Sequence, residues 1–577
     1  MRLWQGLVFV PLTAGVMISA AYAQQSPADD FARRQAAQQS QQKIEALRAL
    51  TPNENNETEP SWLEGQNIIP SDGQCFTVER IVVEGAYKIS ARTVAGIASH
   101  YNGKCVGLAD IQAVMKALTN AYLAKGYVAA RLYIPEQDMK SSRVLKLVVM
   151  EGALSDIYYN GKSVSIYDGV MLSAFPGLKG RTLNMRDIEQ GLDQINRLAS
   201  NNAKSEMLPG GEDGGTIVNV VNLPDKRWQA FVSHDNLGQA STGYARYNAG
   251  LTLNNVLRVN DLWNFSYQRT DKDYWRGSRL DGDSNSISGS VSIPHGYWTF
   301  NVSGYYYEYK SLVAGNFGPI KTSGDSSELR GSVSRLLHRD GKSLTTLNFG
   351  LAYKETNNFL LGSKIEVGSR NYTVANLGLS HSRQMLAGTW TFDVNYLQGL
   401  GLFGAVKKDE AGAGDAEPEF SKFTAAISAM TPFRIREQNF VLSNLLSGQY
   451  SPDSLFGAEQ MSLGSSSNVR GARDSLLFGN NGFFIRNELA WRTVPWGRNA
   501  ALVKALGELR PYAGLDYGQI FAQARYGFED DNLAGWTVGA KLAGGGLSLD
   551  AGYSEIFSST VKRDGSGLAF ISMTVSF

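Results

Sequence analysis

The chain contains 577 residues, with 55 lysines and arginines against 54 aspartates and glutamates, so its formal net charge is +1. A chain of this length is expected to form two to four domains. The balanced charge argues against a nucleic-acid-binding protein, because the basic face of such a protein normally gives a positive net charge. Only 19% of the residues are charged and 16 are prolines, whereas 61 are glycines and 11% are aromatic. This composition favours a chain rich in β-strands over a helical membrane protein.

The first 23 residues have the organisation of a secretory signal peptide. Arg2 provides the positive start, residues 7–20 are apolar, and residues 21–23 (Ala-Tyr-Ala) form a small-residue cleavage site. A single membrane anchor is the alternative, but the apolar run is short and a glutamine-rich segment follows it. No later run reaches the ~18 apolar residues of a transmembrane helix. We therefore expect an exported mature chain that can cross a membrane only as a β-barrel.

The next part of the chain, up to residue 74, changes from helix-forming to linker-like. We expect a helix within residues 24–50, because acidic residues occupy its first turn and Arg48 lies near its end. Its apolar face is thin, so this helix must lodge in a polar environment or remain loose. Residues 51–74 are acidic and polar and contain three prolines, which predicts a linker.

Cys75 and Cys105 are the only two cysteines of the sequence. In an oxidising compartment, a lone pair with this separation predicts one disulfide, with two buried free thiols as the alternative. Such a bond stabilises a fold by about 3–4 kcal/mol through loop closure. No C-x-x-C motif is present, so redox catalysis has no support.

Two consecutive segments, residues 75–152 and 153–225, are predicted to be small α/β units. In the first, residues 76–85 alternate as a strand, and a helix with one apolar face ends at Gly126 before two further strands. The second segment repeats this plan more weakly, with an amphipathic helix over residues 185–195. The simplest interpretation is an internal repeat with the order β-α-α-β-β.

Helical periodicity disappears from residue 226 onward, and sixteen strand-like segments follow. In the segment beginning near residue 297, apolar and polar side chains alternate, and in the last segment Ile571, Met573 and Phe577 share one face. Strands that are apolar outside and polar inside are typical of a membrane β-barrel. We interpret the terminal Phe577 as the C-terminal signal of this barrel.

The connections between these segments separate into two length classes. Short turns at residues 294–296, 339–341 and 544–545 alternate with longer polar connections near 271–283, 311–324, 399–417 and 451–481. Outer-membrane barrels have short periplasmic turns and long outer loops, whereas a soluble β-sandwich does not segregate its connections in this way. We therefore predict a mainly β fold with a 16-stranded transmembrane β-barrel over residues 226–577, the strand count being uncertain by two.

No pattern in the sequence indicates catalysis, a cofactor or a metal site. The histidines have no metal-ligand spacing and are interpreted as structural or surface residues; they are residues 100, 234, 295, 338 and 381. The glycine-rich segment 210–215 lacks the Lys-Ser/Thr pair of a phosphate-binding loop and is predicted to be a turn. Trp263, Tyr297 and Trp298 lie near strand ends, as the residues of an aromatic girdle do.

The order of signal peptide, short helix, linker, two α/β units and barrel resembles that of the two-partner secretion transporters. This is the TpsB group of the barrel-assembly superfamily, which includes the haemolysin and filamentous-haemagglutinin transporters. The two α/β units are similar to polypeptide-transport-associated (POTRA) domains; the first matches at residues 75–76, 81–85, 125–128 and 134–138. Residues 235–243 and Asp261 resemble the start of the family's barrel. The resemblance covers nearly the whole mature chain.

The most specific part of this resemblance is Asn468-Val469-Arg470-Gly471, inside the connection 451–481. In the family, this V-R-G-[YF] motif lies at the tip of a loop that folds back into the barrel, and its arginine pairs with an inward-facing aspartate. The resemblance assigns that role to Asp516, which strand parity also places on a polar face. A bidentate fork would then hold the loop in one geometry. Ala472 replaces the usual aromatic residue, so the tip is expected to pack less tightly; an ordinary solvated arginine is the alternative.

The resemblance implies type V, two-partner secretion across a bacterial outer membrane. The cargo would be one large, unfolded secreted protein, an adhesin, a haemolysin or a contact-dependent toxin. The periplasmic POTRA units would capture an extended segment by strand addition, and helix 24–50 would plug the barrel at rest. Outer-membrane lipid is the other expected partner, and we expect neither a nucleotide nor a nucleic acid.

Two alternative functions remain at this point. The first is a factor that inserts other barrels into the membrane; the presence of only two POTRA-like units and of the N-terminal helix argues against it. The second is a diffusion porin, in which the two α/β units and the V-R-G loop would have no role.

Overall fold

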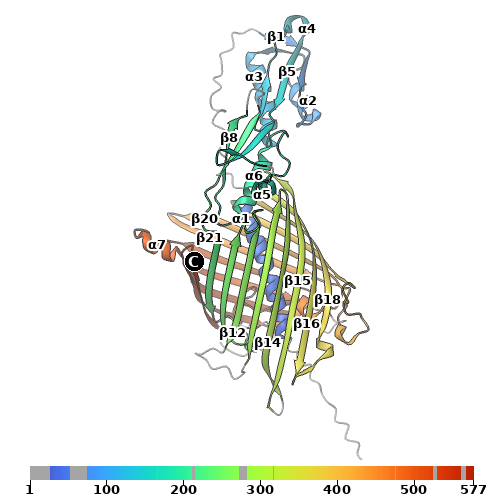
Figure 1. Cartoon of the computed structure of the whole chain (residues 1–577), viewed down its shortest axis with the longest axis vertical. Helices are drawn as coiled ribbons and strands as arrows, with labels where there is room; N and C mark the ends of the chain where they lie inside the picture. The colour runs from blue at the N-terminus through green and yellow to red at the C-terminus, as the bar shows by residue number, and fades with distance from the viewer. Residues whose placement is uncertain are drawn as a thin grey trace, which may run out of the picture.

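The computed structural model describes residues 26–51, 75–165, 167–210, 215–271, 282–315, 318–472, 474, 476–523, 525, 529–560 and 567–577. The predicted signal peptide (1–23), the predicted linker apart from Thr51, and most of the predicted turn at 210–215 lie outside this part of the chain. Figure 1 shows the two α/β units stacked in series on one end of a barrel, with a helix inside the barrel. None of the described helices has the length and the apolar character that a membrane-spanning helix needs.

The N-terminal helix, α1 (Pro27–Leu50), has the polarity that its sequence predicts. The Ser26 side chain accepts a hydrogen bond from the Asp29 N–H and so caps the first turn, in which proline occupies the first position. Two aspartates lie at the N-terminal end of the helix and Arg48 lies at its C-terminal end, each complementing the helix dipole. At 1.5 Å per residue the 24-residue helix is about 36 Å long, which matches the height of a membrane barrel.

The first α/β unit packs two helices against a three-stranded sheet. Its elements are β1 (Cys75–Val78), β2 (Arg80–Glu84), α2 (Ala91–Ser99), β3 (Lys104–Gly107), α3 (Leu108–Ala124), β4 (Ala130–Tyr133), α4 (Met139–Ser142) and β5 (Val144–Glu151). The sheet order is β2-β5-β4, and β2 runs parallel to β5. The fully buried Val114, Leu118 and Leu145 form its core. Cys75 and Cys105 form a disulfide that joins the paired strands β1 and β3, with a Cα–Cα distance of 5.3 Å.

The second α/β unit lies between the first unit and the barrel. It consists of β6 (Leu154–Tyr159), β7 (Lys162–Ser163), α5 (Gly169–Ala174), α6 (Met185–Asn196), β8 (Lys204–Pro209) and β9 (Thr216–Val221). The sheet order is β7-β6-β9-β8, so β8 lies at an edge. Ile188, Ile195 and Val218 are fully buried between helix and sheet. Both units therefore contain the parallel strand pair and the covering helices of the predicted repeat.

Sixteen long antiparallel strands close the barrel, as predicted. They are β10 (Trp228–Asp235), β11 (Ala245–Asn254), β12 (Leu262–Asp271), β13 (Asp283–His295), β14 (Trp298–Gly315), β15 (Gly318–Arg339), β16 (Ser343–Leu360), β18 (Arg370–Met385), β19 (Gly388–Leu400), β20 (Ser421–Ile435), β21 (Gln438–Tyr450), β24 (Gly482–Arg492), β25 (Glu508–Ile520), β26 (Asp531–Ala543), β27 (Leu547–Ser559) and β28 (Leu568–Ser576). The two-residue β17 (Ser363–Lys364) extends the end of β16. Closure occurs between β10 and β28, and the N–H of the terminal Phe577 donates to the Ala230 carbonyl at this seam.

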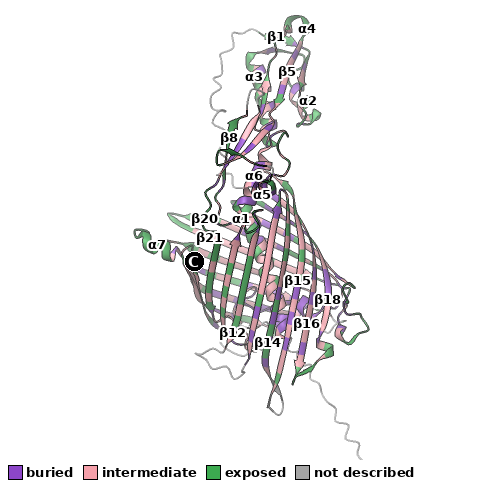
Figure 2. Ribbon diagram, viewed as in Figure 1, coloured by how far each residue is buried: buried purple, intermediate pink, exposed green. Residues whose placement is uncertain are grey.

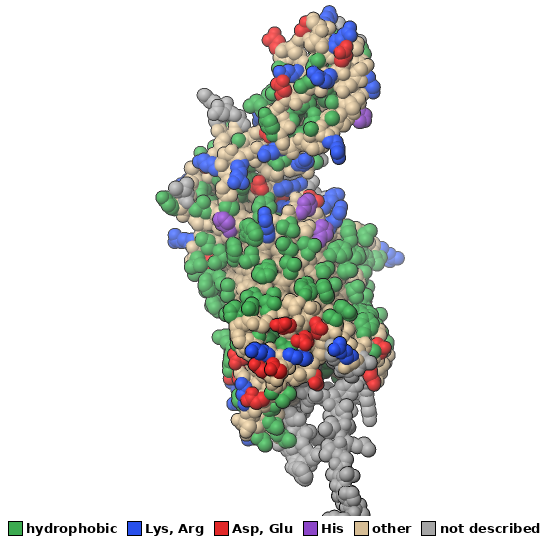
Figure 3. Space-filling view, turned by 90° about the vertical axis from the view of Figure 1, so that its right-hand side faces the viewer, with side chains coloured by type: hydrophobic (Ala, Val, Ile, Leu, Met, Phe, Trp, Pro, Cys, Tyr) green, Lys and Arg blue, Asp and Glu red, His purple; other side chains and the backbone are tan. Residues whose placement is uncertain are grey.

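The outer surface of the barrel is apolar and its inner surface is polar. Phe300, Val302 and Tyr306 are 45–50% exposed on the outer face of β14, whereas Tyr305 and Tyr307, on the inner face, are buried. Figure 3 shows the outer side chains as a broad hydrophobic band across the visible face of the barrel, and Figure 2 shows the exposed residues spread over its strands. The alternation predicted from the sequence therefore describes a lipid-facing wall.

Two connections differ from the expectation. Residues 311–324 are not a loop, because β14 and β15 continue as a paired hairpin through Ser311 and Thr322, beyond the apolar band. Polar residues there form strand because the hairpin has left the bilayer and its outer face no longer needs to be apolar. At the opposite end, the connection 493–507 contains a short helix, α7 (Ala500–Leu506), for which the sequence analysis made no prediction. Figure 1 shows α7 projecting from the barrel beside the C-terminus.

The second α/β unit is fixed to the barrel through short turns. The Tyr297 hydroxyl donates to Asp187 of α6 at 2.6 Å, so Tyr297 joins two domains and is not a residue of the aromatic girdle. Arg339, at the end of β15, pairs with Asp193 of the same helix. Burial lowers the pKa of Arg197 to about 10, with Asp261 opposing the shift, and this guanidinium donates to the Asn260 carbonyl in the β11–β12 turn. These contacts hold the unit beneath the barrel mouth.

Candidate functional site: the interior of the barrel

The connection 451–481 folds into the barrel and forms an inner layer on its wall. Within it, β22 (Met461–Leu463) and β23 (Leu477–Gly479) pair as a small hairpin. Leu463 and Val469 are fully buried against wall residues such as Ile520. Ala472 is only partly buried and packs at the edge of this cluster. The loop is thus attached by apolar packing as well as by charges.

The structure brings Arg470 and Asp516 together, the pair that the family resemblance assigns. The Arg470 Nε donates to Asp516 Oδ2 at 2.6 Å and its Nη2 to Oδ1 at 2.8 Å, which is a bidentate fork. The backbone N–H of Arg470 adds a third bond to the same carboxylate at 3.1 Å. Both residues are at most 5% exposed, so this arginine is not an ordinary solvated surface residue. The fork fixes both the position and the direction of the loop tip.

A second carboxylate, which the sequence analysis missed, completes this ion-pair cluster. Glu488 on β24 accepts from Arg470 Nη1 at 2.7 Å and from Lys541 Nζ at 2.8 Å. With Asp516 and with Arg486, which lies 4.0 Å from Glu488, the cluster contains three cations and two anions. Glu488 occupies one of the positions of β24 whose side chains alternate toward the lumen. This alternation alone does not distinguish it from the many other polar residues that face the lumen.

Glycine is required where the loop tip meets the wall. Gly471 has a φ of +126°, and a Cβ on it would lie 2.4 Å from the backbone of Glu555. Opposite, a Cβ on Gly535 would lie 2.1 Å from the Arg470 carbonyl oxygen. The Gly of the V-R-G motif therefore follows from both backbone conformation and close approach.

Helix α1 runs lengthwise through the barrel (Figure 1). At its N-terminal end, farthest from the α/β units, Asp29 accepts two hydrogen bonds from Arg370 Nη2, at 2.8 and 3.1 Å. Phe31 stacks on Tyr307 with ring centroids 4.1 Å apart, and its other neighbours are the inward tyrosines of β14. The inward tyrosines at residues 305, 307 and 309 thus form an aromatic surface on which Phe31, an apolar residue of a mostly polar helix, packs.

The second half of α1 contacts the wall through polar side chains. Lys43 pairs with Asp393 on β19 at 2.6 Å. Closer to the α/β units, Arg48 donates to the Ser428 hydroxyl, and Thr51 shares a hydrogen bond with Ser382. These contacts explain why the helix has a thin apolar face: its surroundings are the polar lumen that the sequence analysis required.

Helix α1 and the inward loop also touch each other. Arg33 donates to the Gly457 carbonyl, and its guanidinium lies 4.7 Å from the Phe478 ring centroid. One helix side chain therefore contacts the loop at two points, one near its start and one near its end. Two residues beyond Gly457, the buried Glu459 carboxylate accepts from Lys354 on β16 and from Lys422 on β20. A movement of the helix would therefore change its contacts with a loop segment that is itself fixed to the wall.

The comparisons with known proteins agree with this architecture. Residues 214–542 match the family described as haemolysin secretion/activation protein ShlB/FhaC/HecB, and residues 76–152 and 156–209 match POTRA domains, the first of ShlB type. A membrane barrel with two POTRA domains and an inward loop defines the class. The chain belongs to the ShlB/FhaC/HecB family, which confirms the resemblance noted in the sequence.

Individual relatives cover almost all of the chain. The outer membrane transporter CdiB of Dickeya dadantii (strain 3937) is 31% identical over 547 residues, 94% of this chain and 93% of the relative. The hemolysin transporter protein ShlB of Serratia marcescens is 28% identical and covers 83% of this chain and 80% of its own. The solved structure of CdiB from Escherichia coli, 29% identical, superposes with a TM-score of 0.84 over 96% of this chain and 99% of that one.

Proposed function

We propose that this protein is an outer-membrane transporter that moves a large secreted partner protein, unfolded, from the periplasm to the cell surface. Family membership supports a transport function, and the names of the relatives, outer membrane transporter and hemolysin transporter, extend it to this chain. The observation that carries the proposal is a barrel whose lumen holds two elements in addition to its wall, α1 and the inward loop 451–481. A diffusion porin needs neither these elements nor POTRA domains.

We further propose the roles of the separate parts. Residues 1–23 direct export and are removed, helix 24–50 closes the pore at rest, and residues 51–74 connect this helix to POTRA 1 (75–152) and POTRA 2 (153–225). The edge strand β8 supports partner capture by strand addition, because Met207 and Leu208 are exposed on it. The pore then opens when α1 leaves, and the partner passes through the barrel of residues 226–577.

The Arg470–Asp516 pair is proposed to hold the loop tip in the position that transport requires. Asp516→Asn removes a charge-assisted fork worth about 1.5–3 kcal/mol, so about 10- to 100-fold more molecules have a displaced loop and secretion falls. Asp550→Asn is the matched control, since Asp550 is another partly buried lumen carboxylate but bonds to Tyr512 of the wall. Equal secretion by both variants would contradict this role.

The function is tested by comparing the secreted and outer-membrane proteins of cells with and without the gene. We expect one large secreted protein to disappear while the other outer-membrane barrels keep their abundance. Its restoration by the wild-type gene identifies the partner. A broad loss of outer-membrane barrels would instead support the assembly-factor alternative and overturn the proposal.

A further inference from the structure

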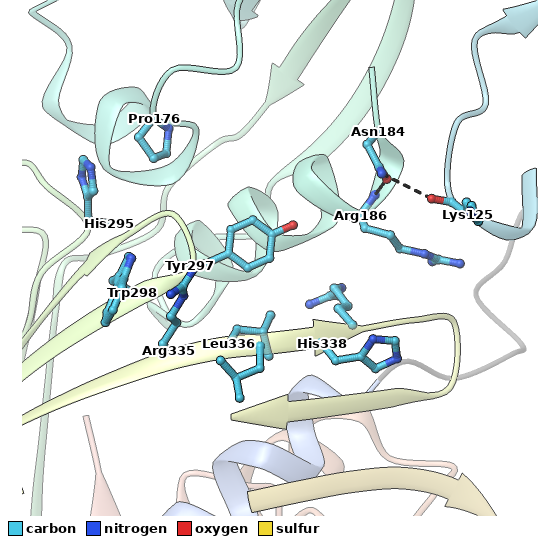
Figure 4. A pocket seen from close by; sticks show the side chains of 12 residues that line it. Lys125, Pro176, Asn184, Arg186, His295, Tyr297, Trp298, Arg335, Leu336 and His338 are labelled. Atoms are coloured by element: carbon cyan, nitrogen blue, oxygen red, sulfur yellow. Dashed lines mark hydrogen bonds between the residues drawn. The ribbon is translucent and has the colours of Figure 1, made fainter. Parts of the chain in front are cut away.

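A cleft of about 630 Å³ opens where the two POTRA domains meet the rim of the barrel. POTRA 1 contributes Lys125, POTRA 2 contributes Arg186 at the start of α6, and the barrel contributes Trp298, Arg335 and His338. Figure 4 shows Trp298 and Arg335 on one side of the cleft and Lys125 on the other, with the Asn184 amide donating to the Lys125 backbone carbonyl. In Figure 3, Lys, Arg and His side chains gather between the hydrophobic band and the POTRA domains.

Several charges around the cleft are already neutralised. Arg186 pairs with Glu189 of its own helix at 2.9 Å, and Arg339 pairs with Glu189 and Asp193. His338 lies 3.2 Å from Asp340. These pairs fix the walls of the cleft but leave little positive charge for a ligand.

Two cations remain without a carboxylate partner among the described residues. The Arg335 guanidinium lies over the Trp298 ring, 4.8 Å from its centroid. The Lys125 Nζ reaches only the Lys88 carbonyl, at 3.4 Å. Both side chains are exposed, so each can turn toward an anion in the cleft. Their charges come from two different domains and meet at one opening.

One wall of the cleft is the outer surface of the barrel. Arg335 and Trp298 are cross-strand partners in the β14–β15 pair, and the next outward partners toward the membrane are Phe300 and Val333. Phe300 is 47% exposed within the hydrophobic band, and Leu337 is 50% exposed on the other side of Arg335. The cleft is therefore continuous with the lipid-facing surface, at the level where aromatic and basic residues meet headgroups.

We propose that this cleft binds the phosphate headgroup of an anionic phospholipid from the periplasmic leaflet of the outer membrane. The acyl chains lie against the band that begins at Phe300, and the phosphate lies between Arg335 and Lys125, whose charges it complements. Because Lys125 belongs to POTRA 1, a bound lipid ties the distal POTRA domain to the barrel rim. The proposal rests on the membrane position of the barrel and not on the secretion of a partner, so the two can fail separately.

The test measures lipid retention on the full-length protein by native mass spectrometry. Purified protein in detergent is titrated with phosphatidylglycerol, with phosphatidylcholine, and with phosphatidylglycerol in the presence of millimolar inorganic phosphate. We expect one phosphatidylglycerol to be retained in preference to phosphatidylcholine. The double variant Arg335→Gln/Lys125→Gln should bind it about 25-fold more weakly, roughly fivefold for each charge removed near the membrane surface.

Arg383→Gln is the matched control. Arg383 is also exposed and has a tryptophan, Trp390, as its cross-strand partner, but it does not line the cleft. This variant should retain phosphatidylglycerol like the wild type, and heat-modifiable migration of each variant on gels verifies a folded barrel.

Four results would overturn the proposal. Equal retention of the two lipids by the wild-type protein, or equal phosphatidylglycerol binding by the double variant and the control, would show that the cleft does not recognise an anionic lipid. Full displacement of the lipid by inorganic phosphate would assign the cleft to free phosphate. Reduced secretion by the double variant with unchanged lipid binding would assign it to an acidic segment of the secreted partner.

Discussion

Neutralising Asp29 should open the pore at rest, because this carboxylate holds the N-terminal end of α1 inside the barrel. Asp29 and Arg370 are both largely buried, and two hydrogen bonds from one guanidinium nitrogen join them. In Asp29→Asn the arginine stays buried without a counter-charge while the helix is in place, but it is hydrated once the helix leaves. The substitution therefore destabilises the plugged state selectively.

The size of the effect follows from the strength of such a bond. Hydrogen bonds to charged groups contribute about 1.5–3 kcal/mol, and a loss of about 2 kcal/mol changes the ratio of plugged to open channels about 30-fold. A channel that is open about 1% of the time would then be open about a quarter of the time. Lys43→Gln removes the second ion pair, 14 residues and about 21 Å along the helix, so the two effects should add.

Single-channel recording in planar bilayers measures this open fraction directly. Glu45→Gln is the matched control, since it removes one negative charge from the same helix at an exposed position. We expect long open periods in Asp29→Asn and wild-type traces in Glu45→Gln. If both variants record like the wild type, the ion pairs do not hold the helix in the pore and the plugging role assigned to α1 is refuted.

Three further predictions concern other parts of the molecule. Cys75→Ser should lower the free energy of unfolding of POTRA 1 by about 3–4 kcal/mol, measured by chemical denaturation against the oxidised wild-type protein; a midpoint unchanged from that of the oxidised protein would contradict a stabilising disulfide. Gly471→Ala should abolish secretion, whereas Gly544→Ala, which has φ +87° and no atom within 4 Å of the added Cβ, should cost only the backbone strain of about 1–2 kcal/mol; equal secretion by the two would refute the close-approach argument. Burial works to raise the pKa of Asp340, but hydrogen bonds from Lys342 and its neighbours outweigh it and lower this pKa to about 2. A lowered carboxyl pKa stabilises the fold above its usual value of 3.8 and the contribution is lost as the pH falls toward 2, so Asp340→Asn should reduce the acid-induced drop in melting temperature between pH 5 and pH 2.

Most of the fold was predictable because the bilayer imposes a strict rule on each strand. Outward residues must be apolar, and this gives every membrane-crossing segment a period of two that can be read from the sequence. The rule ends where the bilayer ends, which is why the hairpin through residues 311–324 was mistaken for a loop. Helix α7 was missed for a related reason: a seven-residue segment outside the bilayer is too short for a helical period to stand out among turns.

The candidate site was predictable only where a motif or parity singled out a residue. Arg470 and Asp516 were identified through the V-R-G resemblance and strand parity together. Glu488 and Glu459 were not, because an acidic residue facing a polar lumen resembles every other lumen residue until its partner is known. The wall residues that contact α1 were not predicted for the same reason. The ion pairs of Asp29 and Lys43 join residues about 350 positions apart in the sequence.

The covalent attachment of α1 to the rest of the chain makes the plug an intramolecular competitor. The 23 residues from 52 to 74 can span at most ~80 Å, so a helix that has left the lumen stays close to the barrel mouth. Its effective concentration there is on the order of millimolar for a tether of this length, whatever the protein's abundance in the cell. In the proposed mechanism, a dilute partner therefore competes with a concentrated ligand to enter, and we expect the pore to close again when the last of the partner has passed.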